Sequence, residues 1–206
     1  IGIITFKRDV NSIWLRSNNK LKTIVIPASA RDIMFKDCGA LASVVILNGL
    51  VDIQDNAFNG CKNLLTINIP NSVATIGKSA FNYCINLSSV KIPSSVSTIY
   101  EGAFSRCENL ASIIIPEGVV SIGPHAFSDC INLESVIIPA SVSTIGMGAF
   151  FTKDKIINHI ELYAKNPPSL SSFSFGSEQE IYVLPECVDT YMKNSSWNKY
   201  VIKPIE

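Results

Sequence analysis

Residues 89–107 read SVKIPSSVSTIYEGAFSRC, and this stretch decides the fold because the chain repeats it several times. It contains an alternating apolar run that ends in proline, a second apolar pair, and a phenylalanine followed three residues later by a cysteine. Aligned copies are spaced by 23 residues and open on Leu41, Leu64, Leu87, Leu110 and Leu133. One such unit cannot bury its apolar side alone, so this strict period predicts a solenoid of stacked rungs.

The apolar columns of the repeat predict short strands. After the leucine, apolar residues alternate with outward positions, which is typical of a half-buried strand. The two inward columns are Val44, Ile67, Val90, Ile113 and Val136, and Ile46, Ile69, Ile92, Ile115 and Ile138. Proline follows in most copies and ends the strand, because it cannot donate a further ladder hydrogen bond. The next apolar pair predicts a return edge, and A-F-x-x-C predicts one compact helical or 3₁₀ turn.

Two local features of the repeat lead to further expectations. The unit that opens on Leu21 is shorter than the others, and its three missing residues lie between Ile33 and Phe35. Glycine often follows the return edge, but Gln54 and Tyr100 occupy the same column in other copies. A position that demanded a positive φ would seldom accept tyrosine. We therefore expect that the backbone conformation at this position favours glycine but does not require it.

Phenylalanine and cysteine form the last two columns of the repeat. Their members are Phe35, Phe58, Phe81, Phe104, Phe127 and Phe150, and Cys38, Cys61, Cys84, Cys107 and Cys130. A residue type that every rung carries serves a need of every rung, so we interpret both columns as packing and not as reactive sites. We expect these cysteines and Cys187 to be free thiols, because stacked side chains point in parallel and disfavour the disulfide dihedral of about 90°.

Composition and motifs argue against several function classes. The 17 basic and 17 acidic residues cancel, so no basic groove for nucleic acid is indicated. No apolar run approaches the roughly 18 residues that cross a bilayer. Close cysteine pairs of the zinc type, a nucleophile elbow and a phosphate loop are all absent, and His125 is expected to face solvent. We therefore expect no catalytic residues, no metal, no cofactor and no enzymatic activity.

The repeat pattern L-x-S-V-x-I-P-x-S-V-x-x-I-G-x-x-A-F-x-x-C-x-N-L over residues 21–158 resembles the BspA-like leucine-rich repeats of bacterial surface proteins. The last stretch, IYVLPECVDTYMKNSSWNKYVIKPIE, resembles the usual ending of that family. The resemblance implies a right-handed, β-rich leucine-rich-repeat solenoid with a parallel sheet on one face, short helical or 3₁₀ turns and a C-terminal cap. It also implies a secreted or cell-surface location, and known members have been linked to adhesion to host matrix proteins.

The chain divides by its repeat pattern. We expect residues 1–20 to be an N-terminal segment or partial repeat, and residues 21–158 to be an array of about six rungs. Residues 159–206 are expected to form terminal irregular repeats and a cap within the same folding unit. In this part, 160–164 and 181–185 read as strands, NPPSLSS as a loop, and the stretch from Pro185 as a short helix, with Tyr191 and Trp197 covering the open end. Residues 1–206 contain no signal peptide, so the targeting segment is expected to lie outside this chain.

Function in a solenoid depends on outward columns that vary between rungs. The first outward column carries Ser or Thr in each copy, and the second changes from valine to asparagine, lysine and isoleucine. An Ile–Ile pair exposed on a flat sheet is a candidate contact patch. The candidate ligand face comprises Ser89, Lys91, Ser112, Ile114, Ser135 and Ile137. One hypothesis is an adhesion or interaction module that binds an extracellular protein or glycan, and the other is an inert spacer that displays further domains of a larger surface protein.

Overall fold

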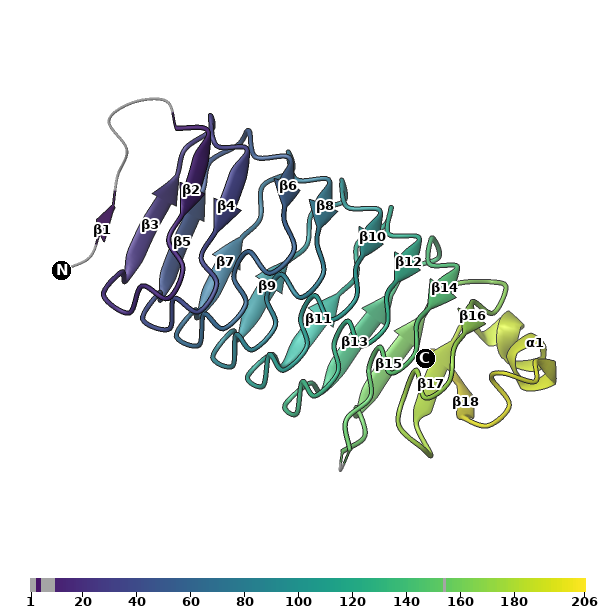
Figure 1. Ribbon diagram of the computed structural model, residues 1–206. Coiled ribbons are helices and arrows are strands. Elements are labelled where there is room, and N and C mark those ends of the chain that lie inside the picture. Colours follow the sequence, from purple (N-terminus) through teal and green to yellow (C-terminus); the bar gives the residue numbers. More distant parts are fainter. Residues whose placement is uncertain (1–2, 5–9, 154) are drawn as a thin grey trace.

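Each repeat forms one rung of a parallel β-solenoid, and about 8 such turns follow one another along the chain (Figure 1). The computed structural model describes residues 3–4, 10–153 and 155–206. Paired strands run parallel and join neighbouring rungs. The expected fold class, a β-rich leucine-rich-repeat solenoid with a C-terminal cap, is confirmed.

One side of the solenoid is a row of strands that the L-x-x-V/I-x-I part of each repeat forms. The first ladder contains β1 (Ile3–Ile4), β3 (Thr23–Ile26), β5 (Ser43–Ile46), β7 (Thr66–Asn68) and β9 (Ser89–Lys91). The second contains β11 (Ser112–Ile114), β13 (Ser135–Ile138), β15 (His159–Leu162), β17 (Glu180–Val183) and β18 (Val201–Pro204). Because β9 and β11 contact each other, the two ladders follow one another along the same side of the array.

The return edge of each rung forms a second row of shorter strands on the opposite side. A six-stranded sheet contains β6 (Asp52–Ile53), β8 (Thr75–Ile76), β10 (Thr98–Ile99), β12 (Ser121–Ile122), β14 (Thr144–Ile145) and β16 (Ser169–Leu170). Two further strands, β2 (Ser12–Trp14) and β4 (Asp32–Met34), pair with each other beside β6. The described part of residues 1–20 therefore continues both rows of strands, through β1 and β2.

The shortened unit is completed by a side chain. Ile33 lies in β4 and Phe35 stacks in the phenylalanine column, so the three missing residues are absent between them as predicted. The side-chain amide of Gln54 accepts a hydrogen bond from the backbone N–H of Ile33 at 3.0 Å and donates one to the carbonyl oxygen of Arg31 at 3.1 Å. An amide side chain thus supplies the bonds that a longer turn would make with its own backbone.

The A-F-x-x-C segment forms two successive hydrogen-bonded turns instead of a continuous helix. In one rung the N–H of Ala57 donates to the carbonyl oxygen of Gln54, and the N–H of Cys61 donates to that of Phe58. The third residue of each turn has a positive φ, as in a type II turn, which prevents the turn from extending into a helix. These left-handed residues form two columns: Asn56, Ser79, Gly102, His125 and Gly148, and Asp37, Gly60, Tyr83, Arg106 and Asp129.

The glycine column after the return edge does not adopt a positive φ, which agrees with the interpretation from Gln54 and Tyr100. Space is nevertheless tight there. A Cβ on Gly123 would lie 2.8 Å from the backbone nitrogen of Glu101, on the previous rung. Glycine at this position therefore allows neighbouring rungs to approach closely, which the sequence interpretation did not include.

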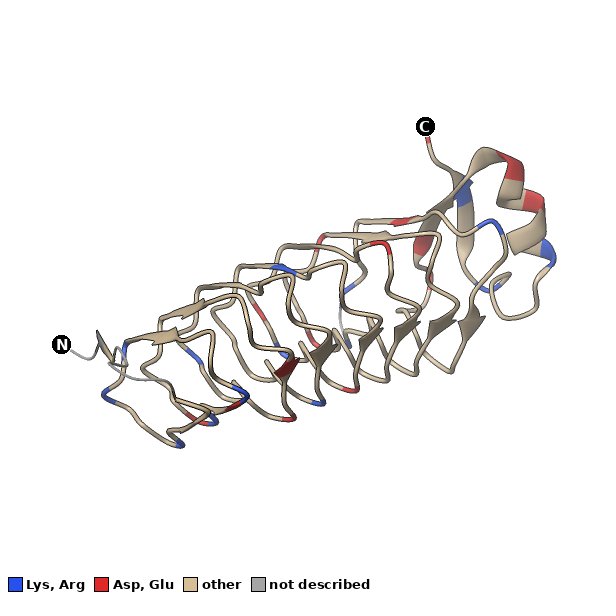
Figure 2. Ribbon diagram, turned by 90° about the horizontal axis from the view of Figure 1, so that it is seen from above, with Lys and Arg blue, Asp and Glu red and all other residues tan. Residues whose placement is uncertain are grey.

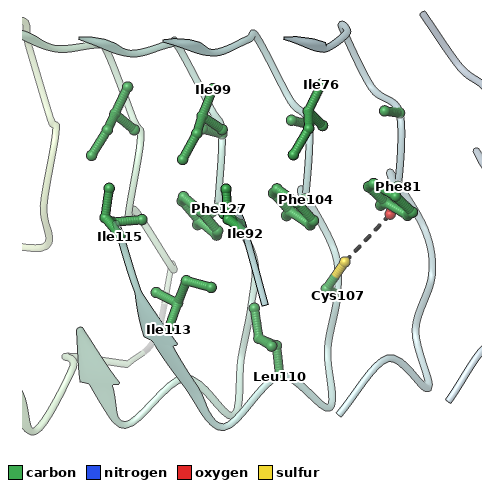
Figure 3. Close-up of a cluster of buried hydrophobic side chains, with 14 of the residues drawn as sticks. Ile76, Phe81, Ile92, Ile99, Phe104, Cys107, Leu110, Ile113, Ile115 and Phe127 are labelled. Carbon is green, nitrogen blue, oxygen red and sulfur yellow. Dashed lines mark hydrogen bonds between the residues drawn. The ribbon is translucent and has the colours of Figure 1, made fainter. Parts of the chain in front are cut away.

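The core lies between the two rows of strands and runs the length of the array. Successive phenylalanine rings are stacked with centroids 5.1 Å apart for Phe81 and Phe104 and 5.3 Å apart for Phe104 and Phe127 (Figure 3). All six predicted phenylalanines are fully or almost fully buried, as are the five cysteines of the repeat. The apolar columns predicted from the period form this core.

The rung pattern continues beyond residue 158 with a longer spacing. Phe175 stacks on Phe150 with ring centroids 5.4 Å apart, and so forms a further member of the phenylalanine column. The strand β16 pairs with β14, and the N–H of Ser169 donates to the carbonyl oxygen of Ser143 at 2.8 Å. The prediction that NPPSLSS is only a loop is therefore wrong, because a strand on the previous rung supplies pairing that the local sequence does not show.

The C-terminal cap closes the end of the core. It comprises the 3₁₀ helix η1 (Pro185–Cys187), the helix α1 (Val188–Lys193) and β18, which pairs with β17 (Figure 1). Tyr191 donates its hydroxyl to the carbonyl oxygen of Ala164 at 2.7 Å, and Trp197 donates its indole N–H to that of Pro168 at 2.8 Å. Both rings are fully buried, so the predicted covering role of Tyr191 and Trp197 is confirmed.

Candidate functional site

The outward side of the strands from β3 to β18, which we term the broad face, carries the candidate residues. Residues alternate in burial along each strand, exposed-buried-exposed in both β7 and β11, so alternate side chains point away from the core. The first outward column contains Thr23, Ser43, Thr66, Ser89, Ser112, Ser135, His159, Glu180 and Val201. The second contains Val25, Val45, Asn68, Lys91, Ile114, Ile137, Glu161, Tyr182 and Lys203.

The predicted face residues lie together but are not equally exposed. Ser89, Lys91 and Ser112 are exposed, and the side chain of Ile114 is 64% exposed. Ser135 and Ile137 are only partly exposed. The expectation of an exposed Ile–Ile pair is therefore wrong for Ile137. Its strand β13 lies between β11 and β15, which place Ile114 and Glu161 directly beside it.

A group of polar and aromatic side chains at the C-terminal end of the broad face was missed by the sequence analysis. We term it the end cluster, and its members are His159, Glu161, Tyr163, Glu180, Tyr182 and Lys203. Glu161 lies 2.8 Å from the Nε2 atom of His159 and accepts a hydrogen bond from the hydroxyl of Tyr163 at 2.7 Å. Both of its carboxylate oxygens are therefore held by neighbours on the same strand or just beyond it.

The second carboxylate of the end cluster is held by a cation. Glu180 accepts a hydrogen bond from Lys203 Nζ at 2.6 Å and from the hydroxyl of Tyr182 at 3.0 Å. The rings of His159 and Tyr182 lie 4.7 Å apart, so the two hydrogen-bonded groups contact each other. The period of two in the strands IELYA and EIYV places these side chains outward, but the sequence analysis gave residues 159–206 no part in the candidate ligand face.

Hydrogen bonding shifts the pKa values of the end cluster. The bond from His159, followed by that from Tyr163, lowers the pKa of Glu161, and the bonds from Lys203 and Tyr182 lower that of Glu180. The pKa of Tyr163 and of Tyr182 is raised in turn by the bond that each donates to its carboxylate. Both carboxylates are thus ionised at neutral pH, and both phenols remain protonated.

A small hollow lies beside the end cluster. Its volume is 270 Å³, and its lining comprises His159, Glu161, Tyr182, Ile205 and Glu206. Two carboxyl groups and two aromatic rings therefore border one depression at the edge of the broad face. The hollow is smaller than the roughly 300–1,000 Å³ of pockets that enclose drug-sized molecules, so an extended surface contact fits this face better than an enclosed site.

The cysteine column lies away from the broad face and has no chemical access to solvent. All six cysteines are free and buried, as predicted. Burial raises the pKa of each thiol in the column, to about 12 for Cys130 and well above its ordinary value for Cys107. A reactive cysteine needs a lowered pKa and an exposed setting, so these thiols are packing groups.

Charged residues outside the end cluster are dispersed. Lys, Arg, Asp and Glu of both signs are spread along the array (Figure 2). Among residues 3–4, 10–153 and 155–206, no three His, Cys, Asp or Glu side chains are grouped closely enough to hold a metal ion. Within the same ranges, no helix has the length and apolar character needed to cross a membrane. His125 is exposed, as predicted, in one of the left-handed turn positions.

The rung geometry is that of a known repeat. The family model of the BspA type leucine rich repeat region matches residues 28–157 in six copies. The chain belongs to this family. No match is found among curated proteins.

Solved structures of the same kind are similar to this BspA-type chain. A leucine-rich cell surface protein from Faecalibacterium prausnitzii A2-165 is 29% identical over 68% of this chain and 47% of its own, with a TM-score of 0.56. A leucine-rich repeat protein from Bacteroides ovatus ATCC 8483 is 24% identical over 97% of this chain and 57% of its own, with a TM-score of 0.57, and shows the shared fold. The chain thus spans about half the length of these proteins.

Proposed function

We propose that the chain is a non-catalytic interaction module of a bacterial cell-surface or secreted protein, and that its broad face binds an extracellular protein or glycan. The carrying observation is the contrast between the outward columns. From β3 to β13 the first column contains only Ser and Thr, whereas the second changes from Val45 through Asn68 and Lys91 to Ile114. Beyond β13 both columns vary, with His159 and Glu180 in the first and Glu161 and Tyr182 in the second. A surface whose shape is constant and whose chemistry varies along its length is suited to selective contact.

The surroundings of the broad face support this proposal. Ile114 is 64% exposed and Val45 in the same column is 45% exposed, so the second column presents apolar as well as charged groups to a partner. The similar protein from Faecalibacterium prausnitzii is a cell surface protein, which favours the same location for this chain. The repeat thiols are buried and their pKa values are raised, so they are unsuited to act as nucleophiles. This supports a non-catalytic role for the chain.

The test is binding of the purified chain to an array of matrix proteins, mucins and glycans. The test variants are Ile114→Glu, which changes an exposed side chain, and the double variant Ile114→Glu/Ile137→Glu. We expect both to lose the bound ligand while Ile114→Glu keeps the melting temperature of the wild type. Val51→Glu/Val120→Glu is the matched control, because these valines are 47% and 48% exposed and lie beside the second row of strands.

The results separate the two hypotheses. A ligand that Ile114→Glu loses and the valine control keeps supports binding through the broad face. A ligand that Ile114→Glu and the valine control both still bind would indicate a site on the turns or the cap. Absence of any ligand at concentrations up to about 100 µM, where a complex worth roughly 5–6 kcal/mol is still populated, would favour the inert spacer.

A further inference from the structure

Four consecutive residues of the second outward column have an ordered chemistry. Lys91, Ile114, Ile137 and Glu161 occupy β9, β11, β13 and β15, so the column reads cation, aliphatic, aliphatic, anion. Ile114 is in register with Ile137, and Ile137 with Glu161. At the usual strand spacing of about 4.8 Å, the four side chains span about 15 Å along the solenoid axis.

The two charges at the ends of this column differ in how far their neighbours already engage them: Lys91 is exposed, whereas the side chain of Glu161 is 20% exposed. Lys91 is exposed and forms no ion pair with any residue of the described part of the chain. Glu161 contacts His159 and the phenol of Tyr163, which lower its pKa and keep it ionised, but no Lys or Arg lies within ion-pair distance of it in the described ranges. One unpaired cation and one carboxylate without a Lys or Arg partner therefore flank an apolar pair.

This order is self-complementary. We infer that the partner of the broad face is a second copy of the chain, packed face to face with the first. The two copies are related by a two-fold axis that runs parallel to the strands and passes between Ile114 and Ile137. This inference rests on the proposed function, because it identifies the protein that the broad face binds. Such an axis reverses the order of the column in the second copy. Ile114 then faces Ile137 of the second copy, and Lys91 faces its Glu161. A two-fold contact forms each of these pairs twice, as isologous interfaces do.

The flanking residues agree with this register. The same axis places Asn68 opposite Tyr182 and Thr66 opposite Glu180, so polar groups face hydrogen-bonding groups and no like charges meet between β7 and β17. Moving the axis onto Ile137 would instead place Ile114 against Glu161 and Lys91 against Tyr182. Burying a carboxylate against an aliphatic side chain is unfavourable, so the chemistry selects one register.

The array is nearly straight, and Ile205 and Glu206 lie beside Glu161 and Tyr182, where they border the proposed contact. In two perpendicular views the rungs follow a nearly straight axis, and the cap lies at the end of the array (Figures 1 and 2). Six strands about 4.8 Å apart and about 10 Å long give a contact of roughly 250 Å² per copy, well below the ~800 Å² of a stable complex. The dimer is therefore weak between free molecules and is strengthened when many copies lie on one surface.

The test uses charge reversal and sedimentation velocity at low salt. We expect the wild type to show concentration-dependent dimerisation between about 10 µM and about 1 mM, the range of a small interface. Lys91→Glu and Glu161→Lys should each remain monomeric, because each places like charges opposite one another. An equimolar mixture of the two variants should dimerise again. In the mixed dimer the introduced glutamate faces the introduced lysine, and the unchanged Glu161 of the first variant faces the unchanged Lys91 of the second. Lys62→Glu, at an exposed turn position, is the control and should behave as the wild type.

Several outcomes would overturn the inference. A wild type that is monomeric at about 1 mM, or a dimer that both charge reversals leave intact, would exclude this interface. Loss of association in both variants without recovery on mixing would exclude the two-fold register. Melting curves check folding, and Lys91→Glu is the safer variant because its side chain is exposed and lies outside the hydrogen-bonded end cluster. If the array finds a ligand that depends on Ile114 while the chain stays monomeric, the proposed function stands and only the second-copy partner is rejected.

Discussion

The thiol of Cys107 donates a hydrogen bond to the carbonyl oxygen of Phe81, 3.3 Å away and one rung earlier in the solenoid (Figure 3). The same bond joins Cys84 to Phe58 and Cys130 to Phe104, each at 3.2 Å. The cysteine column therefore links each rung to the previous one, beside the stack of phenylalanine rings. This relationship explains why a thiol recurs at a position where any small apolar residue would fill the space.

The first prediction concerns access to the thiols. We expect the folded chain to react with no more than a small fraction of its six cysteines when treated with a maleimide at neutral pH, because all six are buried. In denaturant without reductant, mass spectrometry should find all six alkylated. Rapid alkylation of Cys107 in the folded chain would contradict the packing role, and a mass lower by two hydrogens per pair would reveal disulfides.

Alkaline pH should destabilise the chain through the same column. Burial raises the pKa of Cys130 from 9.0 to about 12, so the folded state keeps a proton that the unfolded state releases. This contribution is complete below about pH 9 and is lost as the pH rises toward 12. Each such thiol lowers the free energy of unfolding by about 1.4 kcal/mol per pH unit in that window.

Urea unfolding at a series of pH values measures this slope. A Cys107→Ala/Cys130→Ala variant removes two of the titrating groups, so its free energy of unfolding should fall less steeply above pH 9 than that of the wild type. Burial also raises the pKa of the Tyr191 phenol, which both proteins retain. Its contribution to the slope is therefore the same in wild type and variant, and the difference between the two slopes reports the thiols. Equal slopes in wild type and variant would show that the thiols ionise in the folded state.

Truncating one ring of the phenylalanine stack should be costly. Phe104 is fully buried and stacks on Phe81 and Phe127, so Phe104→Ala leaves a cavity between two rungs. We expect the free energy of unfolding to fall by about 3–5 kcal/mol, and by less for Phe104→Leu, which fills part of the space. Ser97→Ala, at an exposed position, should change it by less than about 0.5 kcal/mol. A loss at Phe104 no larger than at Ser97 would contradict a core role for the stack.

The sequence was sufficient to predict the core because its period repeats the same burial at the same spacing. Phe104 and Cys107 are recognised as packing residues only because equivalent residues stand 23 positions before and after them. Phe175 escaped this reasoning, since residues inserted after Phe150 lengthen that rung to 25 and break the alignment. A period finds members of a column only while the length of the rung is constant.

Two other features depend on contacts that a linear pattern does not record. The left-handed turn positions carry Asn56, Ser79 and His125 as well as glycines, so residue type alone does not mark them. The N–H of each such residue donates to a carbonyl oxygen of the next rung, as Ser79 does to Glu101, so the positive φ is part of the contact between rungs. Its cost is offset by the stacked core. In the candidate site, Ile137 is only partly exposed and lies in register with Glu161, whose strand the sequence analysis had left out of the candidate face.

The final prediction concerns the cap, where a lost hydrogen bond should expose the end of the core. Trp197 donates its indole N–H to the carbonyl oxygen of Pro168 and lies 6.0 Å from the ring of Phe175. Trp197→Phe keeps an aromatic ring but leaves that buried carbonyl without this donor, so we expect a loss of about 1–3 kcal/mol in the free energy of unfolding. Because rungs contact only their neighbours, the loss should appear as local opening of the last rungs.

Hydrogen exchange resolves where the cap variant opens. Amides of β15 and β17 should exchange faster in Trp197→Phe, while those of β5 and β7 at the other end of the array should keep their wild-type protection. Lys193→Ala is the control, because its side chain is exposed on α1 and its contact with Asp189 lies at the 4.0 Å limit of an ion pair. Uniform acceleration along the whole array would mean that the solenoid unfolds as one unit, and that the cap stabilises every rung equally.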